Sequence, residues 1–289
     1  MPLLWIVTAL WAFSFSLIGV YLAGQVDTWF SALSRTVLAA LVFVPFLKPR
    51  QINAQLALKL MAIGAIQIGL MYSFYYHSFL YLSVPEVLLF TVMTPVYITL
   101  INDLLERKTN YHFLFSALLA IVGAITMRYT ELTSDYLFGL LLVQGANLCF
   151  ALGQVGYKKL SEQQTLVHHQ SFGYFFIGAS VVLGLGFMLF GNAQQLPSTE
   201  LQWGIVIYLG LVASGIGYFV WNLGLTRVSV GELAVMNNAL IPAGIMVNLL
   251  IWNREADLLR LGAGSLIIFC ALIYSQRSAK LNSANKGAI

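Results

Sequence analysis

Polar side chains recur at helical spacing inside the apolar segments of this sequence. In the segment 136–158, Gln144, Asn147 and Gln154 fall at i, i+3 and i+10, which places three amides on one face of a helix. An amide both donates and accepts hydrogen bonds, so this face suits the polar edge of a ligand. The alternative is hydrogen bonding between packed helices, worth about 0.6 kcal/mol per contact.

Four further segments carry comparable faces, most of them rich in aromatic residues. Their polar and aromatic members are Trp11, Ser14 and Tyr21; Tyr72, Tyr75, Tyr76 and His77; Ser214, Tyr218, Trp221 and Asn222; and Asn237 and Asn238, shortly before Pro242. For any one residue, contact between helices is an equally good explanation. The whole set predicts a polar, aromatic cavity for a ligand with apolar rings and hydrogen-bonding edges.

Three ionisable residues are candidates for a function within apolar segments, where a charge is costly. Arg35 is either an interfacial arginine that reaches the lipid headgroups or the positive partner of an anionic substrate. Glu86 and Glu232 each occupy the first turn of a predicted helix, where the helix dipole stabilises an acid. The alternative roles for the two glutamates are substrate anchoring and proton coupling.

The composition places these residues in a membrane protein. Hydrophobic residues make up 59% of the 289 residues and charged residues only 9%, whereas a soluble domain has about 25% charged residues. The first apolar run, 3–23, lacks a basic leader and a cleavage site, and we expect it to be retained as a membrane helix. The net charge of +4 lies mostly in short loops and does not indicate nucleic-acid binding.

The apolar runs predict an all-α fold of ten membrane-spanning helices. A spanning helix needs about 20 apolar residues, and runs of this length without alternation argue against a β-barrel. The predicted spans are 3–23, 30–47, 57–79, 83–103, 111–128, 136–158, 171–191, 201–224, 229–252 and 258–276.

The distribution of basic residues predicts that both termini are cytoplasmic, in the inner membrane. With the N-terminus inside, the outer loops hold only Arg128, Arg254 and Arg260. The inner loops and the tail 278–289 then hold Lys48, Arg50, Lys59, Arg107, Lys108, Lys158, Lys159, Arg227, Arg277, Lys280 and Lys286.

The two halves of the chain resemble each other at a constant offset. The segment 83–86 matches 229–232 at three of four positions, and Gly69 and Tyr72 match Gly215 and Tyr218. We therefore predict two repeats of five helices, 1–130 and 136–277, the second inverted because five is odd. Inverted repeats are typical of secondary transporters, which hold their substrate at the repeat interface.

Motifs for metal binding and for catalysis are absent from the sequence. Cys149 and Cys270 lie in apolar runs as small hydrophobic residues, and the histidines do not cluster with carboxylates, so no metal or other cofactor is expected. No phosphate-binding loop, HExxH motif or GxSxG motif occurs. We expect no enzyme and no ATPase subunit; transport would draw on a gradient, on the membrane potential or on consumption of the substrate.

Several segments, in order along the chain, resemble the EamA-type drug/metabolite transporters. They are Trp11–Ser16, Ser34–Thr36, Thr94–Val96, Leu105–Arg107, and the small residues Gly262 and Gly264. The resemblance implies ten helices in an inverted repeat around a central cavity, lined mainly by the first, third, fourth, sixth, eighth and ninth helices. The family often has small apolar residues at the positions of Glu86 and Glu232, and Arg35 matches a general landmark of the family.

Longer stretches resemble the single-component biotin importers within that family. These stretches are Leu88–Val92, Gly139–Gln144, Val155–Lys158, Gly191–Gln194, Ala213–Phe219, Met236–Asn238 and Pro242–Gly244. The resemblance implies a small-molecule substrate, biotin. An exporter of amino acids or other metabolites is the alternative transporter, and a partner or sensor subunit is the alternative outside transport.

The predicted orientation can be tested with reporter fusions. We expect fusions at Lys48 and Lys280 to report a cytoplasmic location and a fusion at Gln195 a periplasmic one, because basic loops stay inside. Alkaline phosphatase and fluorescent-protein activities would be compared at each site. An external C-terminus would overturn the assignment of sides.

Overall fold

The computed structural model describes residues 2–107, 133–252, 262–263, 266 and 270. All regular elements among these residues are helical, in agreement with the predicted all-α class; short 3₁₀ and π segments carry the label η. In chain order the elements are α1 (Pro2–Leu17), η1 (Ile18–Leu22), α2 (Thr28–Phe43), η2 (Val44–Phe46), α3 (Ala54–Gly64), η3 (Ala65–Leu70), α4 (Met71–Ser78), α5 (Val84–Phe90), η4 (Thr91–Met93), α6 (Thr94–Leu105), α8 (Ser134–Gln163), α9 (His168–Phe190), α10 (Glu200–Tyr208), η5 (Leu209–Ile216), α11 (Gly217–Leu225) and α12 (Val230–Trp252).

Consecutive elements join into rods that are long and apolar enough to cross a membrane. Seven such helices occur among the described residues: Pro2–Leu22, Thr28–Phe46, Ala54–Ser78, Val84–Leu105, Ser134–Gln163, His168–Phe190 and Glu200–Leu225. They correspond to seven predicted spans, and α12 corresponds to an eighth. The predicted span 111–128 lies outside the described residues, and only 262–263, 266 and 270 of the span 258–276 are described. The count of ten therefore stays a prediction.

Polar capping residues determine where two helices begin, and the hydropathy pattern placed both starts a few residues too late. Asp27 accepts a hydrogen bond from Phe30 N at 2.7 Å, so α2 begins at Thr28 and not at residue 30. Asn53 accepts from Leu56 N at 2.7 Å and starts α3 at Ala54, ahead of the predicted residue 57. A capping side chain satisfies backbone donors that the first turn leaves unpaired, which apolar content cannot reveal.

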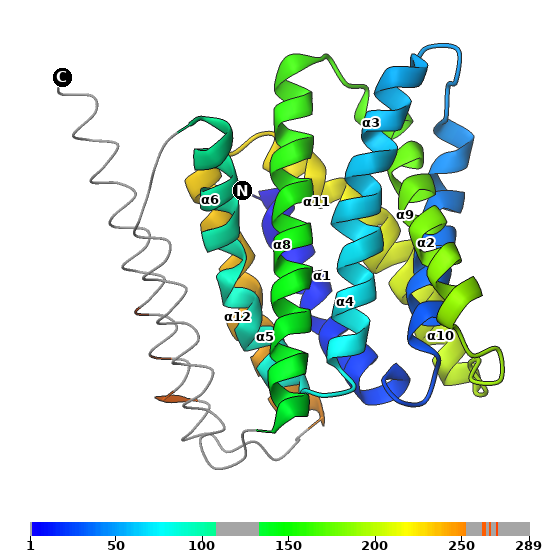
Figure 1. Ribbon diagram of the computed structural model, residues 1–289, viewed down its shortest axis with the longest axis vertical. Helices are drawn as coiled ribbons and strands as arrows, with labels where there is room; N and C mark the ends of the chain where they lie inside the picture. The colour runs from blue at the N-terminus through cyan, green and yellow to red at the C-terminus, as the bar shows by residue number, and fades with distance from the viewer. Residues whose placement is uncertain (1, 108–132, 253–261, 264–265, 267–269, 271–289) are drawn as a thin grey trace.

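The rods lie side by side, with α8 extending along the whole height of the molecule (Figure 1). α8 contacts α6 on one side and α4 on the other, and α9 packs against α2 and α3. Deeper in the molecule, α1 packs against α11 and α12, while α2 packs against η5. Elements of both halves of the sequence therefore enclose the centre.

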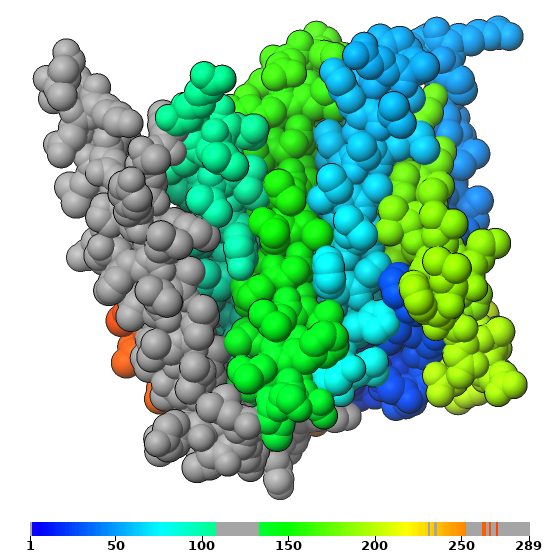
Figure 2. All heavy atoms as spheres, viewed as in Figure 1, coloured from blue at the N-terminus to red at the C-terminus, as the bar shows by residue number. Residues whose placement is uncertain are grey.

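Large apolar side chains cover the outer surface of the rods. The space-filling view shows α8 as a continuous ridge between α6 and the α3–α4 rod (Figure 2). A surface covered with large apolar side chains suits hydrocarbon rather than water, since soluble proteins expose only small contiguous apolar patches. Exposed members on α8 and α9 include Leu137, Phe138, Leu141, Leu148, Leu152, Val181, Leu185, Met188, Leu189 and Phe190.

Close backbone contact joins α3 to α9. A Cβ added at Gly64 would overlap the carbonyl oxygen of Phe175, and one added at Gly178 would overlap that of Met61. Small residues at such crossings let two membrane helices approach closely, and the resulting van der Waals packing holds the helices together in lipid.

Alanine substitutions at these two glycines should destabilise the fold. We expect Gly64→Ala or Gly178→Ala to cost about 1–3 kcal/mol, because overpacking forces the two backbones apart. Thermal unfolding in detergent would measure the effect. Gly204 of α10 is the matched control, since nothing lies within 4 Å of an added Cβ there; its alanine variant should gain up to about 1 kcal/mol from helix propensity. Equal melting of Gly64→Ala and Gly204→Ala would contradict close packing at α3–α9.

Candidate binding cavity

A cavity lies between the two halves of the chain and leaves a volume of about 80 Å³ open to the centres of water-sized molecules. This volume is smaller than the range of about 300–1,000 Å³ found for small-molecule sites, so a ligand of that size requires the lining elements to move apart. Its walls come from α1, η1, α2, α4, η4, α6, α8, α11 and α12. The lining residues are Trp11, Ser14, Phe15, Ile18, Arg35, Met71, Tyr72, Tyr75, Thr91, Thr94, Ala146, Asn147, Phe150, Tyr218, Asn237 and Leu240.

Arg35 on α2 brings a positive charge to this cavity. Its side chain is only 3% exposed, so it lies inside the protein and does not reach a headgroup layer. Its Nε donates to Ser214 Oγ at 2.9 Å and its Nη1 to Tyr76 OH at 3.0 Å. The guanidinium carbon also lies 4.5 Å from the centroid of the Tyr72 ring, a cation–π contact.

The partners of Arg35 in the described part of the chain are all uncharged. No described Asp or Glu lies within ion-pair distance of its guanidinium. A guanidinium has five N–H donors, and the two bonds to Ser214 and Tyr76 leave others for a ligand. An anion entering the cavity would meet a preoriented, desolvated cation.

Aromatic rings form another part of the wall, arranged around Trp11. The Trp11 Nε1 donates to the carbonyl oxygen of Ala213 at 2.9 Å, which fixes the indole. The ring of Trp11 lies 4.9 Å from that of Tyr218 and 6.1 Å from that of Phe150. The Tyr75 ring meets Phe15 edge to face at 5.2 Å. These rings offer apolar faces to a ligand body.

Asn147 on α8 presents an amide at the cavity wall. Its Nδ2 donates to the carbonyl oxygen of Phe90 at 2.8 Å and to Gln144 Oε1 at 3.3 Å. Thr94 Oγ1 donates to Asn147 Oδ1 at 3.2 Å. Gln144 in turn accepts from Tyr97 OH at 3.4 Å. The amide of Asn147 is therefore fixed by neighbours on α5, α6 and α8.

Asn237 on α12 presents a second amide, held from behind by Gln154. Gln154 Nε2 donates to Asn237 Oδ1 at 3.3 Å, and Asn237 Nδ2 donates to Gln154 Oε1 at 3.2 Å. Trp221 Nε1 donates to the same Gln154 oxygen at 3.0 Å. Trp221 and Gln154 thus position Asn237 without lining the cavity themselves.

The structure brings about half of the sequence-predicted site residues to the cavity. Those that line it are Trp11, Ser14, Arg35, Tyr72, Tyr75, Asn147, Tyr218 and Asn237. Gln144, Gln154 and Trp221 lie behind these residues and hold two of them in place. Asn222 donates to the carbonyl oxygen of Tyr218 within its own helix, and Asn238 is buried but does not line the cavity.

Glu86 and Glu232 are absent from the cavity wall. Glu86 Oε2 accepts from Ser83 N at 2.8 Å, and Glu232 Oε2 accepts from Ser229 N at 2.7 Å. Each carboxylate therefore closes a capping box at the start of its helix. Glu232 is exposed. The geometry favours their role as helix caps, and binding of substrate by these two residues stays a prediction.

Sequence reasoning missed Thr91, Thr94, Phe15 and Phe150 among the lining residues. Thr91 and Thr94 lie where the helix tightens into η4 just before Pro95. A proline within a span, preceded by two threonines, is a signal that could have found them. The phenylalanines offered none, since that residue is common on every face of a membrane helix.

Comparisons with known proteins match this chain to transporters. The model of the EamA-like transporter family matches residues 1–129 and again residues 137–276. A protein of Salmonella typhimurium named "Biotin transporter" is 50% identical over 273 residues, covering 94% of this chain and 91% of its own. An Escherichia coli protein of the same name is equally similar, and a "Probable biotin transporter" of Pseudomonas aeruginosa is 50% identical over 268 residues, covering 92% of this chain and 94% of its own.

One solved crystal structure supports the fold. It superposes with a TM-score of 0.67 over 95% of both chains, at 16% sequence identity. At that identity the likeness extends to the fold alone.

The accessibility of the cavity can be tested with two serines on α1. In a protein whose native cysteines are replaced by serine, we expect Ser14→Cys to react with N-ethylmaleimide because Ser14 lines the cavity. Ser16→Cys is the matched control, since Ser16 is fully buried and accepts a hydrogen bond from Asn248 at 3.0 Å. Labelling rates followed by mass spectrometry would compare the two. Equal rates would mean that this space is not open to small molecules.

Proposed function

The chain belongs to the EamA-like transporter family, and on that premise we propose that it imports biotin across the inner membrane by alternating access. It is a multi-pass membrane protein, and its family consists of transporters and not of enzymes. The buried Arg35, held by uncharged partners at a polar and aromatic cavity, is the observation that carries the substrate assignment.

The chemistry of biotin matches the parts of the cavity. Its carboxylate would pair with the free donors of Arg35, a charge-assisted contact worth about 1.5–3 kcal/mol. Its ureido N–H groups would donate to the lone pairs that remain on the amide oxygens of Asn147 and Asn237, whose own N–H groups are already bonded. Its apolar body would lie against the rings of Trp11, Tyr75 and Tyr218.

Export of amino acids is the less favoured function. An amino acid also carries an ammonium group, which needs an anionic or strongly accepting partner. The described lining residues include Arg35 but no Asp or Glu, and both candidate glutamates cap helices elsewhere. The cavity therefore suits an anion better than a zwitterion.

Two inverted five-helix repeats, 1–130 and 136–277, would supply the alternating access, with 278–289 as a cytoplasmic tail. The family model matches the chain twice, once in each half. The π segments η3 and η5 occupy corresponding places in the two halves, as do the caps formed by Ser83 with Glu86 and by Ser229 with Glu232. The cavity draws its walls from both halves, as expected for a site at a repeat interface.

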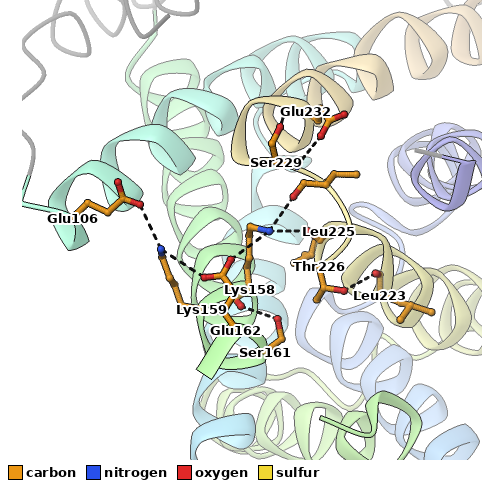
Figure 3. Close-up of polar contacts among 11 residues, drawn as sticks. Glu106, Lys158, Lys159, Ser161, Glu162, Leu223, Leu225, Thr226, Ser229 and Glu232 are labelled. Carbon is orange, nitrogen blue, oxygen red and sulfur yellow. Dashed lines mark hydrogen bonds and ion pairs between the residues drawn. The ribbon is translucent and has the colours of Figure 1, made fainter. Parts of the chain in front are cut away.

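Polar contacts at the C-terminal end of α8 support closure on the predicted cytoplasmic side (Figure 3). Lys158 Nζ donates to the carbonyl oxygens of Val228 at 2.9 Å and Leu225 at 3.4 Å, so it ties α8 to the end of α11. Lys159 pairs with Glu106, just after α6, at 3.5 Å. These bonds join three rods at the end that the charge bias places inside.

Uptake of labelled biotin tests the function, and Arg35 tests the substrate pose. Cells that lack their own importer should accumulate biotin when they express the native chain. Arg35→Gln should weaken biotin binding by about 10- to 150-fold, since it removes the charge-assisted contact. Binding of neutral biotin amide to the purified variant should stay near the native value.

Arg35→Lys is the matched control in this experiment. It keeps the charge but loses the planar fork and the Nε donor, so an intermediate affinity for biotin is expected. Equal losses for biotin and its amide in Arg35→Gln would show that Arg35 does not bind the carboxylate. If cells that express the native chain accumulate no labelled biotin, import is refuted and the export function becomes the better assignment.

A further inference from the structure

Ser214 on η5 lies at the centre of the bonds around Arg35. Its Oγ accepts from Arg35 Nε at 2.9 Å and pairs with Tyr72 OH at 2.8 Å. The serine is completely buried and does not line the cavity. It therefore reaches a ligand only through the two side chains that it holds.

The bond to Ser214 fixes the plane of the guanidinium. An arginine side chain has several rotatable bonds, and a bond at Nε constrains the base of the planar fork. Tyr76 OH holds Nη1 from α4 at 3.0 Å, so the fork is fixed from two sides. Without Ser214 the fork would be held by Tyr76 alone among the described hydrogen-bond partners.

Ser214 also joins the two halves of the chain. Arg35, Tyr72 and Tyr76 come from the first half, whereas Ser214 comes from the second. The preceding residue, Ala213, accepts the indole N–H of Trp11 through its carbonyl oxygen. A single turn of the π segment η5 thus holds both the cation and the central aromatic ring of the cavity.

We infer that Ser214 is a positioning residue that sets the preference of the cavity for an anionic over a neutral ligand. This inference rests on the proposed function, because it concerns recognition of the biotin carboxylate. Ser214 acts by fixing Arg35 in the orientation that presents its free donors. Loss of the Ser214 hydroxyl leaves the positive charge of Arg35 in place but removes the bond that fixes the orientation of the guanidinium.

The test compares Ser214→Ala with Ser180→Ala as the matched control. Ser180 on α9 also bonds α2, donating to Thr36 Oγ1 at 3.1 Å, but its bond does not involve Arg35. With purified protein we expect Ser214→Ala to weaken biotin about tenfold, the order of one hydrogen bond to a charged group. Biotin amide should bind both variants about as well as it binds the native protein, which also shows that both fold.

A second measurement does not depend on biotin. Phenylglyoxal, a small neutral reagent for guanidinium groups, should modify Arg35 faster in Ser214→Ala than in the native protein or in Ser180→Ala. Peptide mass spectrometry would follow that one site. Failure of biotin binding by the native protein would refute the proposed function, and the modification rate would still decide the role of Ser214.

Two results would overturn the inference. One is equal weakening of biotin and biotin amide in Ser214→Ala, which would make the serine a structural contact. The other is an unchanged rate of Arg35 modification, which would show that Tyr76 and Tyr72 orient the guanidinium without it. A KM increase for biotin in uptake assays, with little change in maximal rate, is the expected signature in cells.

Discussion

A buried cation with no acid beside it among the described residues is the constraint on which the centre of this protein depends. Removing a charge from water is costly, and an opposite charge is the usual compensation. Around Arg35 the described compensation is dipolar and aromatic: a serine hydroxyl, a tyrosine hydroxyl and the face of a tyrosine ring. Such partners keep the guanidinium charged and oriented but do not neutralise it. The charge is therefore available to an anion that enters the cavity.

The same arrangement, a contact residue held by a residue behind it, recurs around the cavity. Asn237 is fixed by Gln154, Asn147 by Gln144, and Arg35 by Ser214. Two of these pairs join different elements, since Gln154 lies on α8 and Asn237 on α12, while Ser214 lies on η5 and Arg35 on α2. Fixing an amide or a guanidinium before the ligand arrives lowers the entropy that binding must overcome. Movement of these elements would alter recognition and cavity shape together, which alternating access requires.

The sequence was sufficient to predict the helical class, the positions of the described rods and the faces that carry polar groups. Periodicity identifies which face of a helix looks inward, but it does not tell how deep each residue lies. Gln144 and Asn147 share a face of α8, and only Asn147 reaches the cavity. Trp221 matched the expected aromatic cluster but lies behind Trp11, with ring centroids 5.0 Å apart. The depth of a residue depends on how closely the neighbouring rods pack, and a single sequence does not reveal the distances between rods.

For the two glutamates, the sequence carried a local structural signal beside the functional interpretation. A serine followed three residues later by a glutamate is the signature of a capping box, and both copies form one. A pair of acids at corresponding places in two repeats resembles a coupling device, yet repeats also duplicate ordinary helix caps. The described lining residues then offer one fixed charge, that of Arg35, to any substrate.

Under the proposed function, this fixed charge determines which step of the cycle senses the membrane potential. A biotin anion paired with Arg35 makes the loaded cavity neutral, so the potential exerts little force on its reorientation. The empty cavity keeps the charge of Arg35, and its return to the outside moves that charge against a negative interior. The electrical work is about 2.3 kcal/mol per charge for each 100 mV. Pairing does not remove the cost of importing an anion; it transfers that cost to the empty carrier. Net uptake by this cycle alone then requires that free biotin inside the cell stay scarce, which consumption of the vitamin would ensure.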